Sequence, residues 1–374
     1  MKADFRIKGA GPAGLTAAIA LAREGAVVEV FESRKDCGAR FHGDLQGVEN
    51  WLGTTDFLDD LRDWGIEADF MARPFQKALG IDDRERSVMM GRNSTIFYVI
   101  QRGSAWDSLD QSLQRQALQA GVRLQFEQPI ADEEANLVTS GPVGKPKRGL
   151  AVSEVFETDL EDQAYVLLDN SAASKGYAYL LIAGGHGCLA SILFADFSTA
   201  RQQLEIAKAK LSRVSGIDLE GGNSTGGFTT YSAAPRFSGG DQFFAGEAAG
   251  LQDPLWGFGV RNAMTSGFLA AQGLLNQLDY EAVAESRFTP LVRAGVVNRW
   301  AWETLGHAGY RAILATASRS RNLQNYLHGL CAPSALNRLV FPMARRILDQ
   351  RSKAAEPSPN FSSNQHSPEL LNHP

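Results

Sequence analysis

The N-terminal segment alternates between apolar and polar positions in the order of a strand, a helix and a second strand. Residues 4–8 and 26–31 form short apolar runs, and residues 15–24 between them are small and apolar with helical spacing. Gly25 separates this predicted helix from the second predicted strand. Two strands joined by a helix of this length indicate a βαβ unit, so we expect the fold to begin with a parallel sheet.

The pattern continues to about residue 150 and then changes. Residues 97–101 and 122–126 predict strands, and the periodic segment 106–120 between them predicts a helix. Further along, short apolar runs separated by turn residues predict an antiparallel sheet. These runs cover residues 151–157, 164–169, 177–183 and 188–194. Helical spacing over residues 260–278 and most of 285–351 predicts a helical C-terminal region.

The first turn carries the glycine pattern of a dinucleotide-binding loop. Gly9, Gly11 and Gly14 follow the first predicted strand and open the first helix, with Pro12 and Ala13 between them. These glycines allow a tight turn, a close approach of backbone to a pyrophosphate, and close packing of the helix on the strand. The N-terminus of the helix then faces the negative charge of the phosphates.

An acidic residue stands where a ribose is expected. Glu32 ends the second predicted strand, eighteen positions after Gly14, and is placed to accept hydrogen bonds from an adenosine ribose. A carboxylate at this position disfavours a 2′-phosphate, which argues against tightly held NADP. The other interpretation is a glycine-rich turn beside a surface glutamate.

A second glycine cluster, at residues 244–260, resembles the segment G-D-A-A-G…P-x-x-G-x-G of two-domain FAD oxidoreductases of the glutathione-reductase and hydroxylase type. The matching residues are Gly246, Glu247, Pro254, Gly257, Gly259 and Val260. The resemblance implies FAD as the cofactor, with Glu247, in place of the usual aspartate, near its ribityl or pyrophosphate part. It also implies that backbone N–H groups at Gly257 and Gly259, and a helix beginning near Val260, reach the pyrimidine end of the flavin.

A third segment, Val99 to Leu109, is similar to the R-x-x-F-D-x-x-L stretch of the same families. The resemblance implies that Arg102 lies beside the cofactor. The other interpretation of Arg102 is an ion pair with Asp107 at the end of a strand.

The chain from residue 1 to about 280 resembles the geranylgeranyl reductase family, whose members reduce isolated double bonds of isoprenoids with hydride from FAD. Lys175 to Ile182 is similar to the family strand G-Y-[GA]-W-[IV]-F-P. Tyr177 and Tyr179 on this strand are expected to form one wall of an apolar cavity beside the flavin, or to serve only in sheet packing. His42, where the family often has Cys-Gly-Glu, is a candidate proton donor or a surface loop histidine.

These inferences predict an α/β protein with a Rossmann-like parallel-sheet FAD domain, an antiparallel-sheet substrate domain and a helical C-terminal region. The expected FAD domain is discontinuous, the substrate domain has two parts, and a helical region and a disordered tail follow. The FAD domain is expected to cover residues 1–60, 95–149 and 235–284, and the substrate domain residues 61–94 and 150–234. The helical region is expected to cover residues 285–353 and the tail residues 354–374. The expected substrate is a hydrophobic small molecule. No second dinucleotide motif is present, so the electron donor is NAD(P)H bound transiently or another reductant.

Two other functions are compatible with the same motifs. A FAD-dependent monooxygenase or halogenase is one, although the stretch at residues 139–144 lacks the aspartate of A-D-G-x-x-S, and the halogenase pattern W-x-W-x-I-P is incomplete at residues 300–305. The other is a binding protein in which flavin is only structural. Turnover of the reduced flavin by an added acceptor distinguishes an enzyme from such a scaffold.

Composition and charge indicate the size of the protein, its compartment and its possible partners. With 374 residues, 44% apolar and 21% charged, the chain is long enough for two or three domains. Three cysteines are too few for a disulfide framework or a metal ribbon, and no signal peptide precedes the first strand, so we expect a cytoplasmic protein without a metal site. Residues 285–353 carry eleven basic and three acidic side chains. We expect no nucleic-acid partner, but a basic amphipathic helix at residues 336–351 is a candidate for peripheral contact with a membrane.

Overall fold

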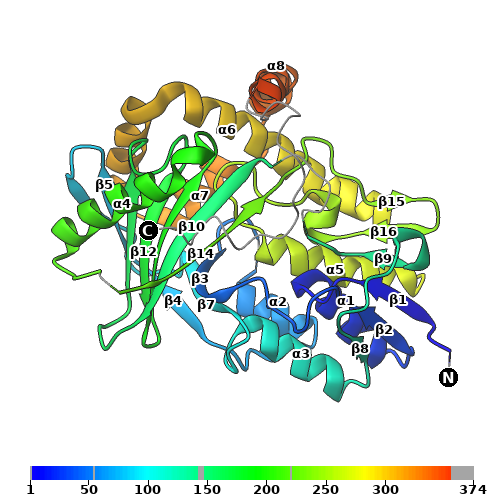
Figure 1. The fold of residues 1–374 in the computed structure, drawn as a ribbon. Helices are drawn as coiled ribbons and strands as arrows, with labels where there is room; N and C mark the ends of the chain where they lie inside the picture. The colour runs from blue at the N-terminus through cyan, green and yellow to red at the C-terminus, as the bar shows by residue number, and fades with distance from the viewer. Residues whose placement is uncertain (1, 54, 142–146, 220, 355–374) are drawn as a thin grey trace.

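The computed structural model describes residues 2–53, 55–141, 147–219 and 221–354, so nearly all of the predicted C-terminal tail lies outside the described residues. A six-stranded sheet in the order β15-β16-β9-β1-β2-β8 forms the first layer (Figure 1). Its strands are β1 (Phe5–Lys8), β2 (Val28–Phe31), β8 (Arg123–Gln125), β9 (Leu137–Val138), β15 (Ser238–Gly239) and β16 (Gln242–Phe244). All pairs are parallel except the β15–β16 hairpin, which confirms the predicted parallel sheet.

Three helices share the hydrophobic core of this sheet. They are α1 (Pro12–Arg23), α3 (Leu109–Gln119) and α5 (Val260–Leu274). A side chain at Gly267 of α5 would overlap the backbone of Ala13 on α1, and one at Gly14 would overlap the carbonyl of Gly9. These glycines therefore allow α1 to lie close both to α5 and to the first strand.

The second layer is a seven-stranded sheet in the order β14-β10-β13-β12-β11-β5-β6. Its strands are β5 (Ala78–Asp82), β6 (Ser87–Met90), β10 (Gly149–Glu157), β11 (Gln163–Leu168), β12 (Tyr177–Ala183), β13 (His186–Leu193) and β14 (Asn223–Thr229). The pairs are antiparallel, as predicted, except that β11 and β5 run parallel. Helix α4 (Ala200–Ser215) buries Leu204 and Leu211 in one core cluster with Leu180 and Leu189 of this sheet.

A three-stranded sheet, ordered β3-β7-β4, lies between the two layers. It consists of β3 (His42–Glu49), β4 (Ala72–Phe75) and β7 (Phe97–Gly103), and the short helix α2 (Phe57–Asp63) follows β3. The segment around His42, predicted to be a loop, is therefore the start of a strand. Its sequence, with glycines at positions 43 and 47, lacks the alternation by which a strand is recognised. At Gly47 a side chain would meet the ring of Phe258 at 3.0 Å, so tertiary contact requires the glycine.

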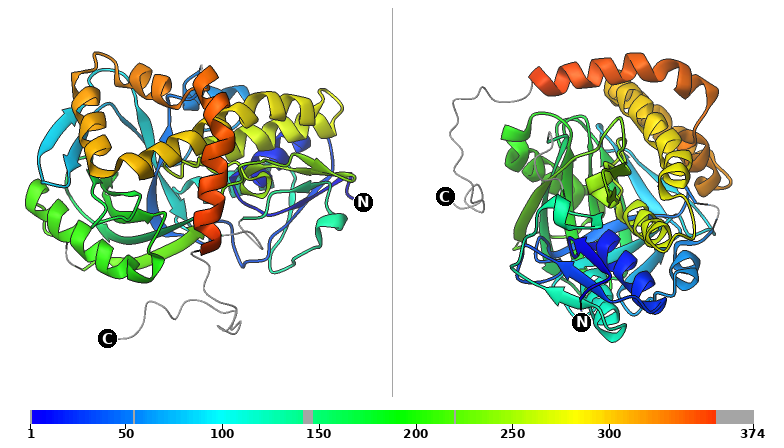
Figure 2. Two further views of the ribbon diagram at one scale, coloured as in Figure 1. Left: turned by 90° about the horizontal axis from the view of Figure 1, so that it is seen from above. Right: turned by 90° about the vertical axis from the view of Figure 1, so that its right-hand side faces the viewer.

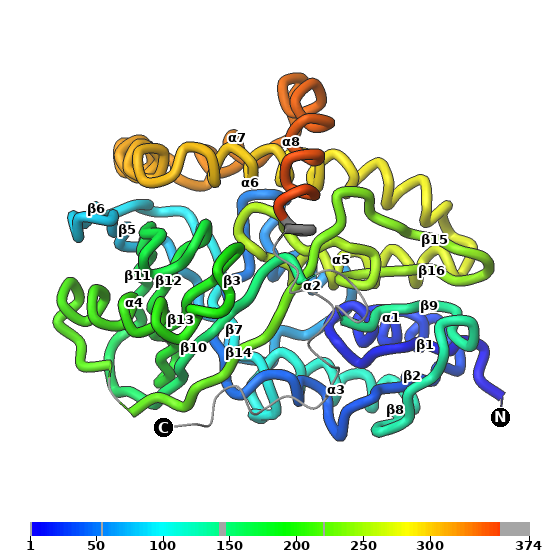
Figure 3. Tube along the Cα trace, turned by 45° about the horizontal axis from the view of Figure 1, so that its top comes forward, coloured from blue at the N-terminus to red at the C-terminus, as the bar shows by residue number. Residues whose placement is uncertain are grey.

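Three helices complete the chain, namely α6 (Tyr280–Arg319), α7 (Leu323–Cys331) and α8 (Ala335–Ala354). Helix α6 kinks at Gly306, where φ is 53°. Helix α8 runs through Pro342, where the sequence predicts an interruption. Pro342 and Arg338 are both exposed, so water can bind the Arg338 carbonyl that the proline leaves without a donor. In Figures 2 and 3, α8 crosses the outer side of α6. Within the described residues, no helix is both long and apolar enough to cross a membrane.

Candidate functional site

The first glycine turn has the geometry of a phosphate-binding loop. Gly9 has φ of +102°, and a side chain there would lie 3.0 Å from the backbone nitrogen of Ser140. A side chain at Gly11, by contrast, would meet no atom within 4 Å. Gly11 is also the N-cap of α1, and no side chain caps the helix there. The open space at Gly11 faces uncapped backbone N–H groups, which fits a pyrophosphate.

Glu32 lies beside this turn. One of its carboxylate oxygens accepts a hydrogen bond from the backbone N–H of Ala10 at 2.9 Å, and the other accepts one from Arg34 at 2.9 Å. The side chain is half-buried. A carboxylate held in this way still has free lone pairs, so it is able to accept hydrogen bonds from a ribose.

The second glycine cluster meets the first. Residues Gly246–Ala249 form the 3₁₀ helix η3, and a side chain at Gly246 would lie 3.0 Å from the side chain of Ala13 in α1. The backbone N–H of Gly246 donates to the hydroxyl of Ser266 in α5 at 2.9 Å. More than two hundred residues of sequence separate the two clusters, yet both lie at the N-terminus of α1.

Glu247 faces the junction between the two large sheets. One oxygen accepts a hydrogen bond from the backbone N–H of Thr230 at 3.1 Å, and the other lies 3.4 Å from Nη1 of Arg40. Arg40 in turn donates to the carbonyl of Phe228 on β14 at 2.5 Å. Sequence reasoning missed Arg40, because nothing in the stretch Gly38 to Phe41 signals its contact with residues beyond position 227.

The loop after η3 is held from inside by a buried carboxylate. Asp253 accepts hydrogen bonds from the backbone N–H groups of Leu255 at 3.2 Å and Trp256 at 2.7 Å. Gly257 has φ of +80°, which favours glycine. Helix α5 begins at Val260 as predicted, and its N-cap, Gly259, carries no capping side chain. The uncapped N-terminus of α5 thus lies at the loop where the resemblance places the flavin.

Tyr177 and Tyr179 join this loop to the central sheet. The hydroxyl of Tyr177 donates to the carbonyl of Trp256 at 2.8 Å, and that of Tyr179 donates to the carbonyl of Leu45 on β3 at 3.0 Å. Their ring centroids lie 6.2 Å apart. Burial raises the pKa of both phenols above the ordinary value, so both stay protonated and keep these bonds. The two hydrogen bonds thus hold the rings in place against the loop and β3.

Other aromatic rings extend this wall. Trp51, just after β3, makes edge-to-face contacts with Trp256 at 6.0 Å and with Phe258 at 5.2 Å between centroids. The ring of Phe258 also lies over Gly47, because a side chain added at position 47 would come within 3.0 Å of that ring. An apolar, aromatic surface therefore lies where the second glycine cluster meets β3 and β12.

Arg102 is fully committed to neighbouring side chains. It forms a bidentate ion pair with Asp110 of α3, with both distances 2.8 Å, and donates to Gln46 at 3.1 Å. The alternative prediction, an ion pair of Arg102 with Asp107, is wrong. Asp107 is exposed in the loop before α3, whereas Asp110 is buried in the first turn of α3 and faces β7. The guanidinium carbon of Arg102 also lies 4.3 Å from the ring centroid of Phe41, the residue after Arg40.

His42 is exposed at the start of β3, and its backbone N–H donates to Asp44 at 2.9 Å. Asp44 is buried and accepts a hydrogen bond from the hydroxyl of Ser153 at 2.9 Å. The strand places His42 opposite Gly103, next to Arg102. Its imidazole is thus open to solvent rather than enclosed in the aromatic wall.

Arg299 and Glu49 are among the buried charged residues that the sequence did not predict. Arg299 of α6 is wholly buried and donates to the carbonyl of Leu255 at 2.8 Å and to that of Lys175, so it ties α6 to the second glycine segment and to the start of β12. Glu49, at the end of β3, is 1% exposed, and its Oε2 has no hydrogen-bond partner among the described residues. Burial raises the pKa of Glu49 to about 7. Neither residue belongs to a recognisable motif.

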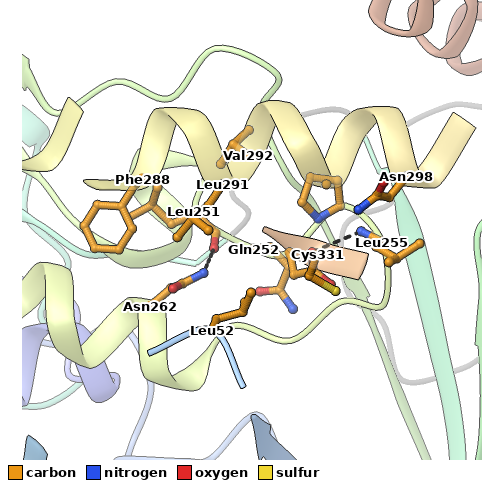
Figure 4. Close-up of a pocket in the computed structure, with 13 residues that line it drawn as sticks. Leu52, Leu251, Gln252, Leu255, Asn262, Phe288, Leu291, Val292, Asn298 and Cys331 are labelled. Atoms are coloured by element: carbon orange, nitrogen blue, oxygen red, sulfur yellow. Dashed lines mark hydrogen bonds between the residues drawn. The ribbon is translucent and has the colours of Figure 1, made fainter. Parts of the chain in front are cut away.

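Two cavities adjoin the site. The smaller, about 20 Å³, lies between α6 and the second glycine segment, where Asn262 donates to the carbonyl of Leu251 at 3.2 Å (Figure 4). Its volume suits one water molecule. The larger, about 480 Å³, is lined by residues that include Ser140, Tyr231 and Arg345. Within the described part of the chain, no group of three His, Cys, Asp or Glu side chains could hold a metal ion.

Residues 7–46 match the sequence family described as NAD(P)-binding Rossmann-like domain. Comparison with curated protein sequences gives no significant match. Among solved structures, the chain is similar to a geranylgeranyl bacteriochlorophyll reductase-like protein from Thermoplasma acidophilum, with 17% identity and a TM-score of 0.67 over 93% of this chain and 98% of the other.

Two further structures are similar over nearly their whole length. A flavin-dependent brominase shares 16% identity with a TM-score of 0.63, covering 94% of this chain and 99% of its own. A flavoprotein/dehydrogenase from Cytophaga hutchinsonii shares 15% identity with a TM-score of 0.61, covering 95% and 99%. At these identities the likeness is one of fold. The predicted fold class, a Rossmann-like parallel-sheet domain joined to an antiparallel sheet and C-terminal helices, is therefore confirmed.

Proposed function

We propose that this protein is a FAD-dependent oxidoreductase that reduces a carbon–carbon double bond of a hydrophobic, isoprenoid-like substrate. The observation that carries the proposal is the aromatic wall of Tyr177, Tyr179 and Trp256, built where the second glycine cluster meets β3 and β12. The Rossmann-like match and the flavin-dependent neighbours support FAD as the cofactor. The reductase-like neighbour supports the choice of reaction.

The residues at the two glycine clusters fit this cofactor. The N-terminus of α1, open at Gly11, would hold the pyrophosphate, and Glu32 would hold the ribose of the adenosine. The uncapped N-terminus of α5 at Gly259 would face the pyrimidine part of the flavin, where it favours negative charge. Reduced FAD, when bound, supplies the hydride.

The chain's own residues supply the surroundings of the reaction. The aromatic wall would exclude water and orient an apolar substrate, because it offers large rings whose hydroxyls are already bonded to the backbone. Addition of a hydride to one carbon of a double bond requires a proton at the other. We propose His42 as the donor of that proton; its side chain is exposed at the start of β3, opposite Gly103.

Anaerobic reoxidation of the chemically reduced protein tests the proposal. Mixing with geranylgeranyl diphosphate should reoxidise the flavin without oxygen, and mass spectrometry should find a product that has gained one hydride and one proton per double bond. NADH and NADPH are then compared as reductants. Reoxidation only with oxygen, with hydroxylated or halogenated products, would instead support the monooxygenase or halogenase alternative. Failure of every acceptor would support the structural flavin.

A further inference from the structure

Helix α8 turns large apolar side chains toward solvent. Leu336, Leu339 and Met343 are 67%, 79% and 47% exposed, and their spacing puts them on one face of the helix. A neighbouring side of α8 is anchored, since Ala344 and Leu348 are buried in the main core cluster. The apolar positions that the sequence groups into one stripe thus divide between a face packed on the core and a face exposed to solvent. Figure 2 shows α8 lying across the outside of the molecule.

Basic side chains lie to one side of the exposed apolar face, and Arg346 is the nearest of them to it. Arg338, Arg345 and Arg346 are all exposed on α8. Among the described residues, Arg338 and Arg346 form no ion pair, whereas Asp349 of α8 pairs with Arg148 at 2.8 Å and with Arg345 at 3.6 Å. The apolar face is therefore flanked on one side by positive charge, and two of these arginines, Arg338 and Arg346, have no acidic partner among the described residues.

We propose that this face of α8 docks the protein on an anionic membrane surface. Leucine and methionine side chains can enter the boundary between headgroups and acyl chains, while the arginines contact anionic headgroups. A second copy of the chain fits the face less well, because two such faces brought together would oppose arginine to arginine. The proposal does not depend on the proposed reaction, since it rests on α8 alone.

Vesicle co-sedimentation of the full chain tests this docking. Vesicles of phosphatidylcholine with phosphatidylserine are compared with phosphatidylcholine alone, at low and at high salt. We expect binding to the anionic vesicles that weakens with salt. The double variant Arg338→Gln with Arg346→Gln should bind about five-fold more weakly for each arginine removed. The double variant Leu336→Ser with Leu339→Ser should bind at least about tenfold more weakly.

Matched controls separate docking from general surface effects. Leu118→Ser removes a leucine that is 51% exposed on α3, and Arg84→Gln with Arg92→Gln removes two exposed arginines elsewhere; both should bind as the wild type does. Equal binding to neutral and anionic vesicles, no binding, or binding unaffected by the leucine changes would overturn the proposal. So would a lipid-free dimer, seen by analytical ultracentrifugation, that the leucine changes dissociate.

Discussion

Gly11 is a position where one side chain decides whether a ligand is held. The space beside it is open to 4 Å, so Gly11→Val should fold normally but place a branched side chain in the path of a pyrophosphate. We expect FAD content, measured by visible absorbance after purification with added FAD, to fall by at least about tenfold. Gly329→Val on α7, where the space is equally open, is the control and should keep its flavin. A yellow Gly11→Val protein would contradict the proposed phosphate site.

The proposed role of His42 is tested in the step in which substrate reoxidises the reduced flavin. His42→Ala should leave flavin content and reduction by the donor unchanged, because the side chain is exposed and the change leaves its backbone hydrogen bond to Asp44 in place. Reoxidation by substrate should slow by about 10² to 10⁴, the usual contribution of a general acid. An unchanged rate in stopped-flow measurements would make His42 a surface residue only.

Glu49 links stability to pH. Burial raises the pKa of its carboxyl to about 7 in the folded protein, above the ordinary 4.5. Between these values the folded state holds a proton that the unfolded state has lost, so the free energy of unfolding should fall as the pH rises through this window. Glu49→Gln removes this contribution, and its stability relative to the wild type in urea unfolding should therefore increase from pH 5 to pH 8. Glu281→Gln, an exposed change, serves as the control; equal trends for both variants would exclude the effect.

At the scale of elements, α6 holds the second glycine segment in place through Arg299. Replacing Arg299 with methionine leaves the carbonyls of Leu255 and Lys175 without their buried donor, and among the described residues Glu303 keeps only its ion pair with Arg351. We expect Arg299→Met to lower the free energy of unfolding by about 3–5 kcal/mol, and Arg299→Lys, which keeps the charge, by less. Arg293→Met, an exposed change on the same helix, should cost little. Similar denaturation midpoints for the two methionine variants would show that Arg299 does not hold the segment.

The elements themselves differ in how far the sequence predicts them. The βαβ unit, the strand Tyr177–Ala183 and the start of α5 at Val260 follow from local patterns of glycine and apolar residues. Strand β3 does not, because its glycines and polar residues satisfy contacts with Phe258, Ser153 and Arg102 that lie far along the chain. Pairing with β7 and β4, rather than intrinsic preference, makes this segment a strand.

At the scale of the whole molecule, the site is assembled from both large sheets. Arg40 bridges Glu247 of the second cluster and the carbonyl of Phe228 on β14. FAD bound at this junction should stabilise the fold, by about 2.7 kcal/mol when free FAD is about a hundredfold above its Kd. Arg40→Ala should require about tenfold more FAD for the same rise in thermal midpoint, since Glu247 loses the charge-assisted contact that holds it at the second glycine cluster. Arg84→Ala should behave as the wild type, and an unshifted FAD dependence for Arg40→Ala would remove Arg40 from the site.

The amino-acid sequence by itself determined the glycine turns, the acid after β2, the first βαβ unit and the change to an antiparallel sheet near residue 150, because backbone conformation and periodicity are local properties. Only the tertiary structure decided that Arg102 pairs with Asp110, that Glu49 is buried and that Glu247 reaches Arg40. Each of these depends on which distant segments meet. The same holds for α8, whose periodicity fixed where its apolar side chains lie around the helix, whereas packing on the core left Leu336 and Leu339 exposed.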